Sequence, residues 1–238
     1  MMNDITPAVQ RRMALVAGYS LVAMAIVAGF GYGYGFGSIY VAGDGAATVT
    51  NLNQSAYLFR WVIVAFLVIM LLDVVVAWAL YYFFKPVDEA LSLLTAWLRI
   101  IYAPFLGIAL MNLLAVLPLL NDAAPAESLI MRSLNAFQDV WSLGLVVFGF
   151  HLTLLGYLAL MSRFVPKVLA GLALFAGLCY FLSNLANLAV PDYGQYKGTV
   201  EMALSLPMAL GELALAVWLL IKGGKTKQPR FQSASAEF

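Results

Sequence analysis

The chain has 238 residues, of which 63% are hydrophobic and 11% are charged, and its mean hydropathy is +0.91. Soluble domains are about half apolar and about a quarter charged, so this composition excludes a water-soluble globule and a disordered chain. The net charge of +1 supplies no field that would attract nucleic acid, and the single cysteine excludes a disulfide framework. We therefore predict an all-α, multi-pass transmembrane helical bundle.

Six stretches are apolar enough to cross a bilayer, which takes about 20 residues in a helix. Short connections with glycine or proline separate these stretches, so residues 1–222 are predicted to form a single six-helix domain. Residues 223–238 are predicted to be a disordered basic tail on the cytoplasmic side. The six predicted spans cover about residues 13–40, 57–84, 87–120, 136–161, 166–190 and 199–221.

The end of the first stretch, residues 29–40, alternates glycine with phenylalanine or tyrosine. No strand precedes this segment, and no dinucleotide-binding spacing fits it. Three glycines spaced four residues apart, beginning at Gly29, fall on one face of an α-helix, a pattern that favours close helix packing. The aromatic residues Tyr32, Phe36 and Tyr40 are then expected to face lipid or the aromatic belt.

Two segments on the outer side do not fit simple spans. Asp44 is placed to cap a short helix between the first two stretches. The fourth hydrophobic segment begins at Glu127, and its first third is amphipathic, so we expect this part to lie at the interface before the chain enters the membrane. Both segments are open to two interpretations, packing or a pair of flaps over a cavity.

Basic residues gather on one side of the predicted topology. Cytoplasmic segments of membrane proteins are enriched in lysine and arginine, and an even number of spans puts both termini on the same side. Both termini are therefore predicted to be cytoplasmic. The basic residues on that side are Arg11, Arg12, Lys85, Arg163, Lys167, Lys222, Lys225, Lys227 and Arg230.

Four ionisable residues lie within the apolar stretches: Asp73, Arg99, His151 and Glu212. An ionised side chain at the centre of a span costs about 2.5–3.5 kcal/mol on insertion scales, so such residues persist when they are paired, hydrated or functional. Counted from the basic boundary at 1.5 Å per residue, all four lie roughly 15–20 Å deep. They are therefore predicted to meet near the bilayer midplane, each on a different helix.

This polar layer has two interpretations. Arg99 is the natural counter-ion for Asp73 or Glu212, and His151 would lie beside the charged network. The charges of one acid and one arginine cancel, so the second acid needs a proton or a ligand to balance its negative charge. The layer is either a ligand or proton site or an ion-paired staple that holds the bundle in register.

A second polar set lies nearer the outer side and is predicted to line a vestibule. Asn184 is also open to a role in bridging helices, and Arg60 to one in reaching the outer interface. No catalytic residue, metal ligand or cofactor is assigned, because the motifs for such sites are missing from the sequence, although the residue types of His151, Asp73 and Glu212 could together hold a cation. The vestibule candidates are Arg60, Asn112, Asp139, Asn184 and Tyr193.

Several segments resemble a bacterial integral membrane family called domain of unknown function 4386 (DUF4386). They are residues 43–48 (GDGAAT), 149–158 (GFHLTLLGYL) and 211–222 (GELALAVWLLIK), the stretch 85–99, and residues 166–171 leading to 186–187 and Pro191. The resemblance extends over roughly residues 11–223, with mild departures at Lys167 and Cys179. It implies a multi-pass protein of the bacterial cytoplasmic membrane and brings no established activity.

Three functions remain open. The leading hypothesis is small-molecule binding or transport through the titratable midplane site, with membrane lipids and a small or lipid-like ligand as partners. The second is an intramembrane enzyme acting on a lipid-like substrate, with Glu212 or Asp73 as base and His151 as acid. The third is a non-catalytic sensor or accessory subunit.

Overall fold

The computed structural model describes residues 5–120 and 127–225 of the chain. Within these ranges the backbone is helical, with short turns and no strand, so the all-α prediction is confirmed. The elements are α1 (Pro7–Ala28), the π-helix η1 (Gly29–Phe36), α2 (Gly37–Ile39), α3 (Gly45–Gln54), α4 (Ala56–Phe84), α5 (Glu89–Leu119), α6 (Glu127–Met161), α7 (Lys167–Ala189) and α8 (Gly194–Ile221).

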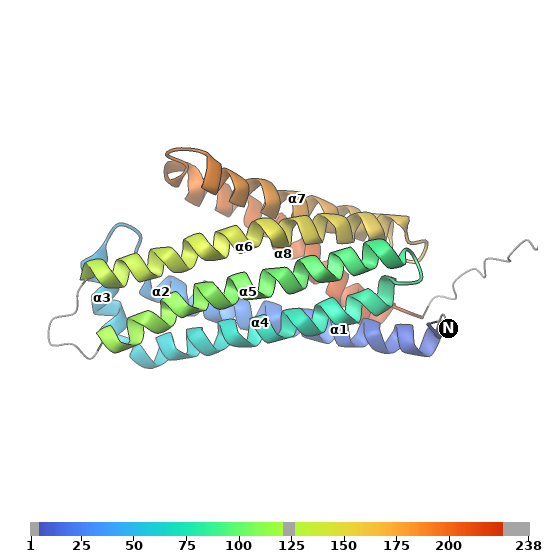
Figure 1. The fold of residues 1–238 in the computed structure, drawn as a ribbon, viewed down its shortest axis with the longest axis horizontal. Coiled ribbons are helices and arrows are strands. Elements are labelled where there is room, and N and C mark those ends of the chain that lie inside the picture. Colours follow the sequence, from blue (N-terminus) through green and yellow to red (C-terminus); the bar gives the residue numbers. More distant parts are fainter. Residues whose placement is uncertain (1–4, 121–126, 226–238) are drawn as a thin grey trace, which may run out of the picture.

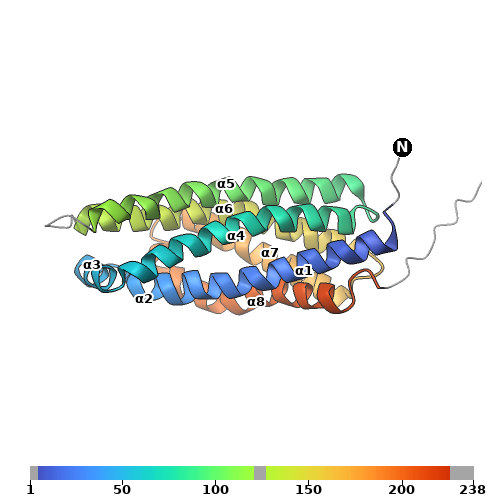
Figure 2. The same cartoon turned by 90° about the horizontal axis from the view of Figure 1, so that it is seen from below.

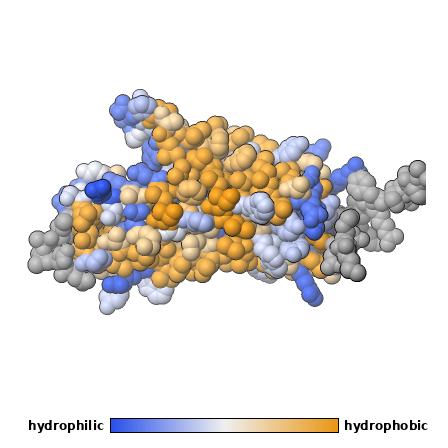
Figure 3. Space-filling model, viewed as in Figure 1, coloured by the Kyte–Doolittle hydropathy of each residue, from blue (hydrophilic) through white to orange (hydrophobic). Residues whose placement is uncertain are grey.

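Six of the helical segments are long and apolar enough to cross a membrane, and they match the six predicted stretches. The first, Pro7–Ile39, combines α1, η1 and α2, and the sixth is the part of α8 from Met202 to Ile221. Figure 3 shows a broad hydrophobic band across the middle of the visible face, with hydrophilic residues towards both ends. Length, composition and surface together indicate a multi-pass membrane protein.

The long helices form a ring in chain order. Each packs against the next one along the chain, and the ring closes where α1 packs against α8 (Figures 1 and 2). At the closure, the Arg11 guanidinium donates hydrogen bonds to the carbonyl oxygens of Leu219, Leu220 and Gly223, at 2.7–3.0 Å. These bonds add side-chain donors to carbonyls at the C-terminal end of α8, where a helix supplies few donors of its own. The start of α1 and the end of α8 therefore lie side by side.

Helix ends follow the local sequence. The Asp44 carboxylate accepts a hydrogen bond from the backbone N–H of Ala47 at 2.9 Å, so the predicted capped helix is confirmed as α3. Asp88 caps α5 in the same way, after the turn at Lys85 and Pro86. The Lys85 ammonium donates to Glu89 at 2.9 Å, and this hydrogen bond raises the pKa of Lys85.

The predicted packing face of the glycine-rich segment is wrong, because it assumed an α-helix. Residues 29–36 form a π-helix, whose hydrogen bonds join residue i to i+5 instead of i+4, and this changes which residues share a face. Gly31 and Gly35 are buried against Ala65 and Val62 of α4, whereas Gly29, Gly33 and Gly37 are exposed. The glycine face expected to pack therefore points outward.

The aromatic residues of this segment also point the opposite way from the prediction. Tyr32 stacks on Phe36, and Phe36 stacks on Tyr40. Phe36 is 3% exposed and contacts Phe137 of α6, while the ring of Tyr32 meets Trp141 edge to face. The expectation that these rings face lipid is wrong, because the π-helix turns them into the bundle.

Helix α6 is continuous over 35 residues, or about 52 Å, so it has no break between an interfacial part and a spanning part. The amphipathic pattern of its first turns comes from packing, because Ile130, Leu134 and Phe137 are buried and this end contacts α3. A membrane core of about 30 Å is shorter than this helix. Residues 226–238 of the predicted tail lie outside the described residues, as does the connection at residues 121–126.

Candidate functional site

Arg99 of α5 brings the four predicted midplane residues together. Its Nε donates to Asp73 Oδ1 of α4 at 2.9 Å, and its Nη1 donates to Glu212 Oε1 of α8 at 3.2 Å. Nη1 also lies 3.3 Å from His151 Nε2 of α6. Asp73, Arg99 and His151 are fully buried, whereas the Glu212 side chain is 26% exposed. The predicted convergence of these residues at one depth is thus a direct hydrogen-bonded cluster.

The hydrogen bonds of His151 define its protonation. Its Nδ1 lies 2.7 Å from the carbonyl oxygen of Thr95, which can only accept, so we assign the ring proton to Nδ1. Nε2 is then the acceptor for the Arg99 guanidinium, which has no acceptor of its own. His151 is therefore a neutral ring that helps to hold the arginine, which also lies 5.3 Å from the centre of the Phe148 ring.

The cluster contains one guanidinium and two carboxyl groups. It carries one negative charge when both acids are ionised and is neutral when one of them holds a proton. Asp73 Oδ2 is buried and receives no hydrogen bond from the residues that the structure describes. A buried oxygen in this state favours a proton or an external hydrogen-bond donor, because an unsatisfied polar group in an apolar interior costs free energy.

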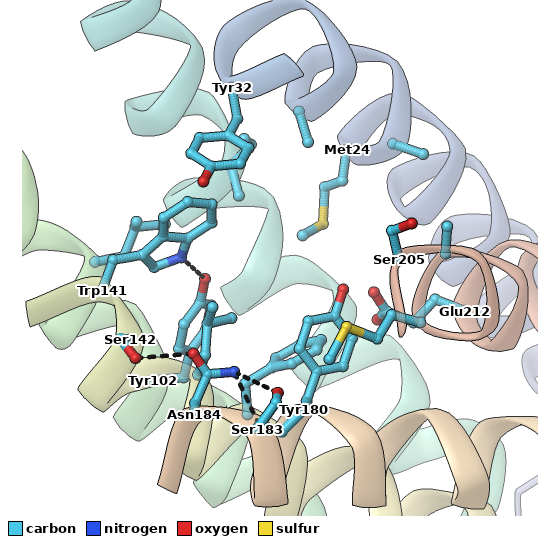
Figure 4. Close-up of a pocket in the computed structure, with 18 of the residues that line it drawn as sticks. Met24, Tyr32, Tyr102, Trp141, Ser142, Tyr180, Ser183, Asn184, Ser205 and Glu212 are labelled. Atoms are coloured by element: carbon cyan, nitrogen blue, oxygen red, sulfur yellow. Dashed lines mark hydrogen bonds between the residues drawn. The ribbon is translucent and has the colours of Figure 1, made fainter. Parts of the chain in front are cut away.

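A cavity of about 510 Å³ reaches this cluster. It lies between α1 and η1 on one side and α8 on the other, with α4 to α7 forming its back wall. Asp73 and Glu212 line the part of the cavity next to Arg99, which we call its inner end, and Figure 4 shows Glu212 there. Arg99 and His151 are not part of the lining, because they lie behind the two carboxyl groups. Most of the lining is apolar or aromatic, and its rings belong to Tyr32, Phe66, Tyr102, Trp141, Phe148, Tyr180 and Tyr193.

The polar side chains of the back wall bind one another. Trp141 Nε1 donates to the Tyr102 hydroxyl at 3.0 Å, and Ser142 Oγ donates to Asn184 Oδ1 at 2.9 Å (Figure 4). Asn187 Nδ2 donates to Ser142 Oγ at 3.0 Å. These bonds join α5 to α6 and α6 to α7, so they fix the shape of the wall.

The sequence profile of a family described as domain of unknown function (DUF4386) matches residues 16–223, which include the cluster and all the lining residues. The chain belongs to this family. An archaeal relative from Archaeoglobus fulgidus, described as an uncharacterized protein, is 32% identical over 168 residues, covering 70% of this chain and 86% of the relative. No solved structure matches the chain.

In this DUF4386 protein, the segments that carried the resemblance have distinct places. In residues 149–158, Gly149 and Gly156 lie against the backbone of α7, and His151 enters the cluster between them. In residues 211–222, Gly211 packs against α7 next to Glu212, which reaches the cavity. Both segments therefore combine close helix packing with one residue of the cluster.

The vestibule candidates separate into two groups. Asn184 and Tyr193 line the cavity. Arg60 and Asp139 are exposed and lie outside its lining, and the Asn112 side chain donates to a backbone carbonyl of its own helix. Depth in the membrane placed all five near the outer side, but the side of the helix on which each residue lies determines whether it reaches the cavity.

Sequence reasoning missed the aromatic and methionine residues of the cavity. Met24, Tyr32, Tyr102, Trp141 and Tyr180 all line it, and within apolar stretches their residue types are equally typical of packing or lipid contact. One signal could have found two of them: buried Trp and Tyr side chains need a hydrogen-bond partner for their polar atoms within a membrane. In the structure, Trp141 and Tyr102 are such partners.

Proposed function

We propose that this protein binds a small, largely apolar molecule inside the membrane, for storage, sensing or transport, and that the polar end of this molecule lies against Asp73 and Glu212. The observation that carries the proposal is the cavity of about 510 Å³ that leads from an apolar, aromatic wall to two carboxyl groups. Ligand pockets commonly combine such an apolar lining with a few convergent polar groups, in volumes of about 300–1,000 Å³.

The rim of the cavity supports entry from the lipid phase. Ala25 and Gly29 on one side and Ser205 and Ala209 on the other are exposed lining residues with small side chains. Large apolar side chains next to them in sequence are turned outward, such as Ile26, which is 68% exposed. In Figure 1 the end of α7 and the start of α8 stand away from the other helices.

We also propose that the protein lies in a bacterial cytoplasmic membrane with both termini in the cytoplasm, so that the cavity opens towards the outer half. The start of α1, the end of α8 and the α4–α5 and α6–α7 connections lie at one end of the bundle (Figure 1). In the sequence these segments carry Arg11, Arg12, Lys85, Arg163 and Lys167. Such clustering of basic residues favours the cytoplasmic side. Labelling of single cysteines introduced at Arg163 and Asp44, in a Cys179→Ser background in intact cells, tests this orientation. Exclusive labelling from outside at Arg163→Cys would reverse it.

The two alternative functions receive less support from the geometry. An enzyme that uses His151 as acid needs this ring at the substrate, but His151 lies behind Arg99 and is 1% exposed. A purely structural cluster accounts for the Arg99 bonds but not for the cavity that ends on Asp73 and Glu212.

Native mass spectrometry of the protein released from mild detergent tests the binding proposal. A bound small molecule or lipid is expected on the wild-type protein and is expected to be lost from the Ala209→Trp variant, because the indole fills the cavity. Ala203→Trp is the matched control, since this alanine is also exposed on α8 but lies outside the lining. A protein that carries no such molecule, or one that carries it equally in both variants, would overturn the proposal.

A further inference from the structure

The charged groups that line the inner end of the cavity are carboxyl groups, and the hydroxyls of Tyr102 and Tyr180 also line the cavity. Asp73 and Glu212 line it, while the guanidinium that pairs with them is buried behind. The Arg99 Nε and Nη1 donors are used by Asp73, Glu212 and His151, and Nη2 lies 3.9 Å from the Met24 sulfur. A ligand that reaches this end therefore meets carboxylate oxygens and not the positive charge.

The charge of the cluster favours a positively charged ligand. When both acids are ionised, two carboxylates and one guanidinium leave one negative charge, and Asp73 Oδ2 lacks a donor among the described residues. A positively charged group at the inner end would neutralise the cluster and supply this donor. An anionic group would bring a third negative charge into an apolar interior, where uncompensated charge is costly.

The aromatic walls of the cavity also favour a positively charged ligand. The rings of Tyr32, Tyr102, Trp141 and Tyr180 surround the path to the acidic end (Figure 4). The face of an aromatic ring attracts cations, most strongly where water is excluded. Among the described lining residues, the one with a basic side chain is Lys197, in the first turn of α8. It lies 15 residues before Glu212, which is about 22 Å along the helix.

We propose that the ligand is a monovalent organic cation, a protonated amine on an apolar body, whose ammonium group binds between Asp73 and Glu212. This inference rests on the proposed function, because it concerns the same cavity. The ammonium would donate to Asp73 Oδ2 and to Glu212, and the apolar body would lie against the aromatic walls.

A matched series of probes tests the charge preference. Adamantane carrying an amine, an alcohol or a carboxylate has one rigid apolar body, and at neutral pH the amine is positive and the carboxylate negative. Equilibrium dialysis of the detergent-solubilised protein measures the binding of each probe, and the Ala209→Trp variant gives the background. The amine is expected to bind about 10- to 100-fold more tightly than the alcohol, the range for a hydrogen bond to a charged group, and the carboxylate more weakly than both.

Two variants of Glu212 test whether the negative charge at the inner end causes the preference for the amine. Glu212→Gln keeps an oxygen that can accept from Arg99 but removes the extra charge, so the advantage of the amine over the alcohol is expected to disappear. Glu212→Asp retains the charge and is expected to retain the advantage. Because the Glu212 side chain is partly exposed, both variants are expected to fold, and their melting curves check this.

The outcomes separate this inference from the proposed function. If the alcohol or the carboxylate binds as tightly as the amine, and Ala209→Trp still abolishes binding, the cavity binds ligands but the cation preference is wrong. A preference that survives in Glu212→Gln would also overturn it. If no probe distinguishes the wild-type protein from Ala209→Trp, both proposals fail.

Discussion

Replacing Arg99 with methionine measures how much the buried cluster contributes to stability. The methionine preserves much of the apolar length of the side chain but removes every N–H donor. Asp73 Oδ1, Glu212 Oε1 and His151 Nε2 then lose the donor that the structure gives them. Removing one partner of a buried ion pair typically costs about 3–5 kcal/mol, because the remaining charge stays buried without compensation.

Two comparison variants make this figure testable. Glu212→Gln retains an oxygen for Arg99 at a partly exposed position, so its cost is expected to stay within the range of a single ordinary hydrogen bond, about 0.5–1.5 kcal/mol. The double variant Asp73→Asn with Arg99→Met removes the uncompensated Asp73 charge as well. It is expected to recover part of the stability that Arg99→Met loses.

The single cysteine provides the assay. Cys179 is 7% exposed within α7, so a thiol-reactive fluorogenic dye reports when this helix separates from the bundle. At about 2–4 °C per kcal/mol for a chain of this size, Arg99→Met is expected to lower Tm by at least about 6 °C. A Tm within about 2 °C of the wild-type value, or a double variant less stable than Arg99→Met alone, would refute the reasoning.

Two further predictions concern helix packing away from the cluster. Gly156→Ala is expected to destabilise the protein by about 1–3 kcal/mol, because the added methyl group meets the backbone of Leu174. The control Gly171→Ala is expected to be neutral or stabilising, because its Cβ meets no atom within 4 Å. Equal melting temperatures for the two variants in the dye assay would contradict this prediction. Arg11→Ala is expected to speed hydrogen exchange of the backbone amides at the C-terminal end of α8, since it removes three bonds to the carbonyls there, and the exposed Arg12→Ala is the control. Unchanged exchange in Arg11→Ala would show that helix packing alone holds this end.

The spans and the convergence of the four cluster residues could be predicted because each depends on distance along the chain. A helix rises 1.5 Å per residue, so counting from a basic boundary gives depth without any knowledge of packing. Asp73, Arg99, His151 and Glu212 were found in this way, and the ion pairs between them follow from charge. The role of Asp44 as a helix cap could also be predicted, because a cap depends only on neighbouring residues.

The cavity could not be predicted in the same way, because it depends on rotation about each helix axis. Asn112 and Asn184 both lie within spans, and both amides donate to a carbonyl of their own helix, yet Asn184 lines the cavity and Asn112 does not. In the first span, the π-helix changes this rotation, so a face drawn on α-helical geometry placed Tyr32 and Phe36 on the wrong side.

The ring arrangement also sets the order in which a growing chain can complete the site. Helices α4 and α5 adjoin in sequence, so Asp73 and Arg99 can form a neutral pair as soon as that hairpin has been synthesised. Glu212 arrives with the last helix, and the bonds that close the ring join residues more than 200 positions apart. A nascent chain halted before α8 would hold the Asp73–Arg99 pair but would lack the α8 side of the cavity. The second carboxyl group of the cluster and that side of the cavity are therefore added together, after the pair.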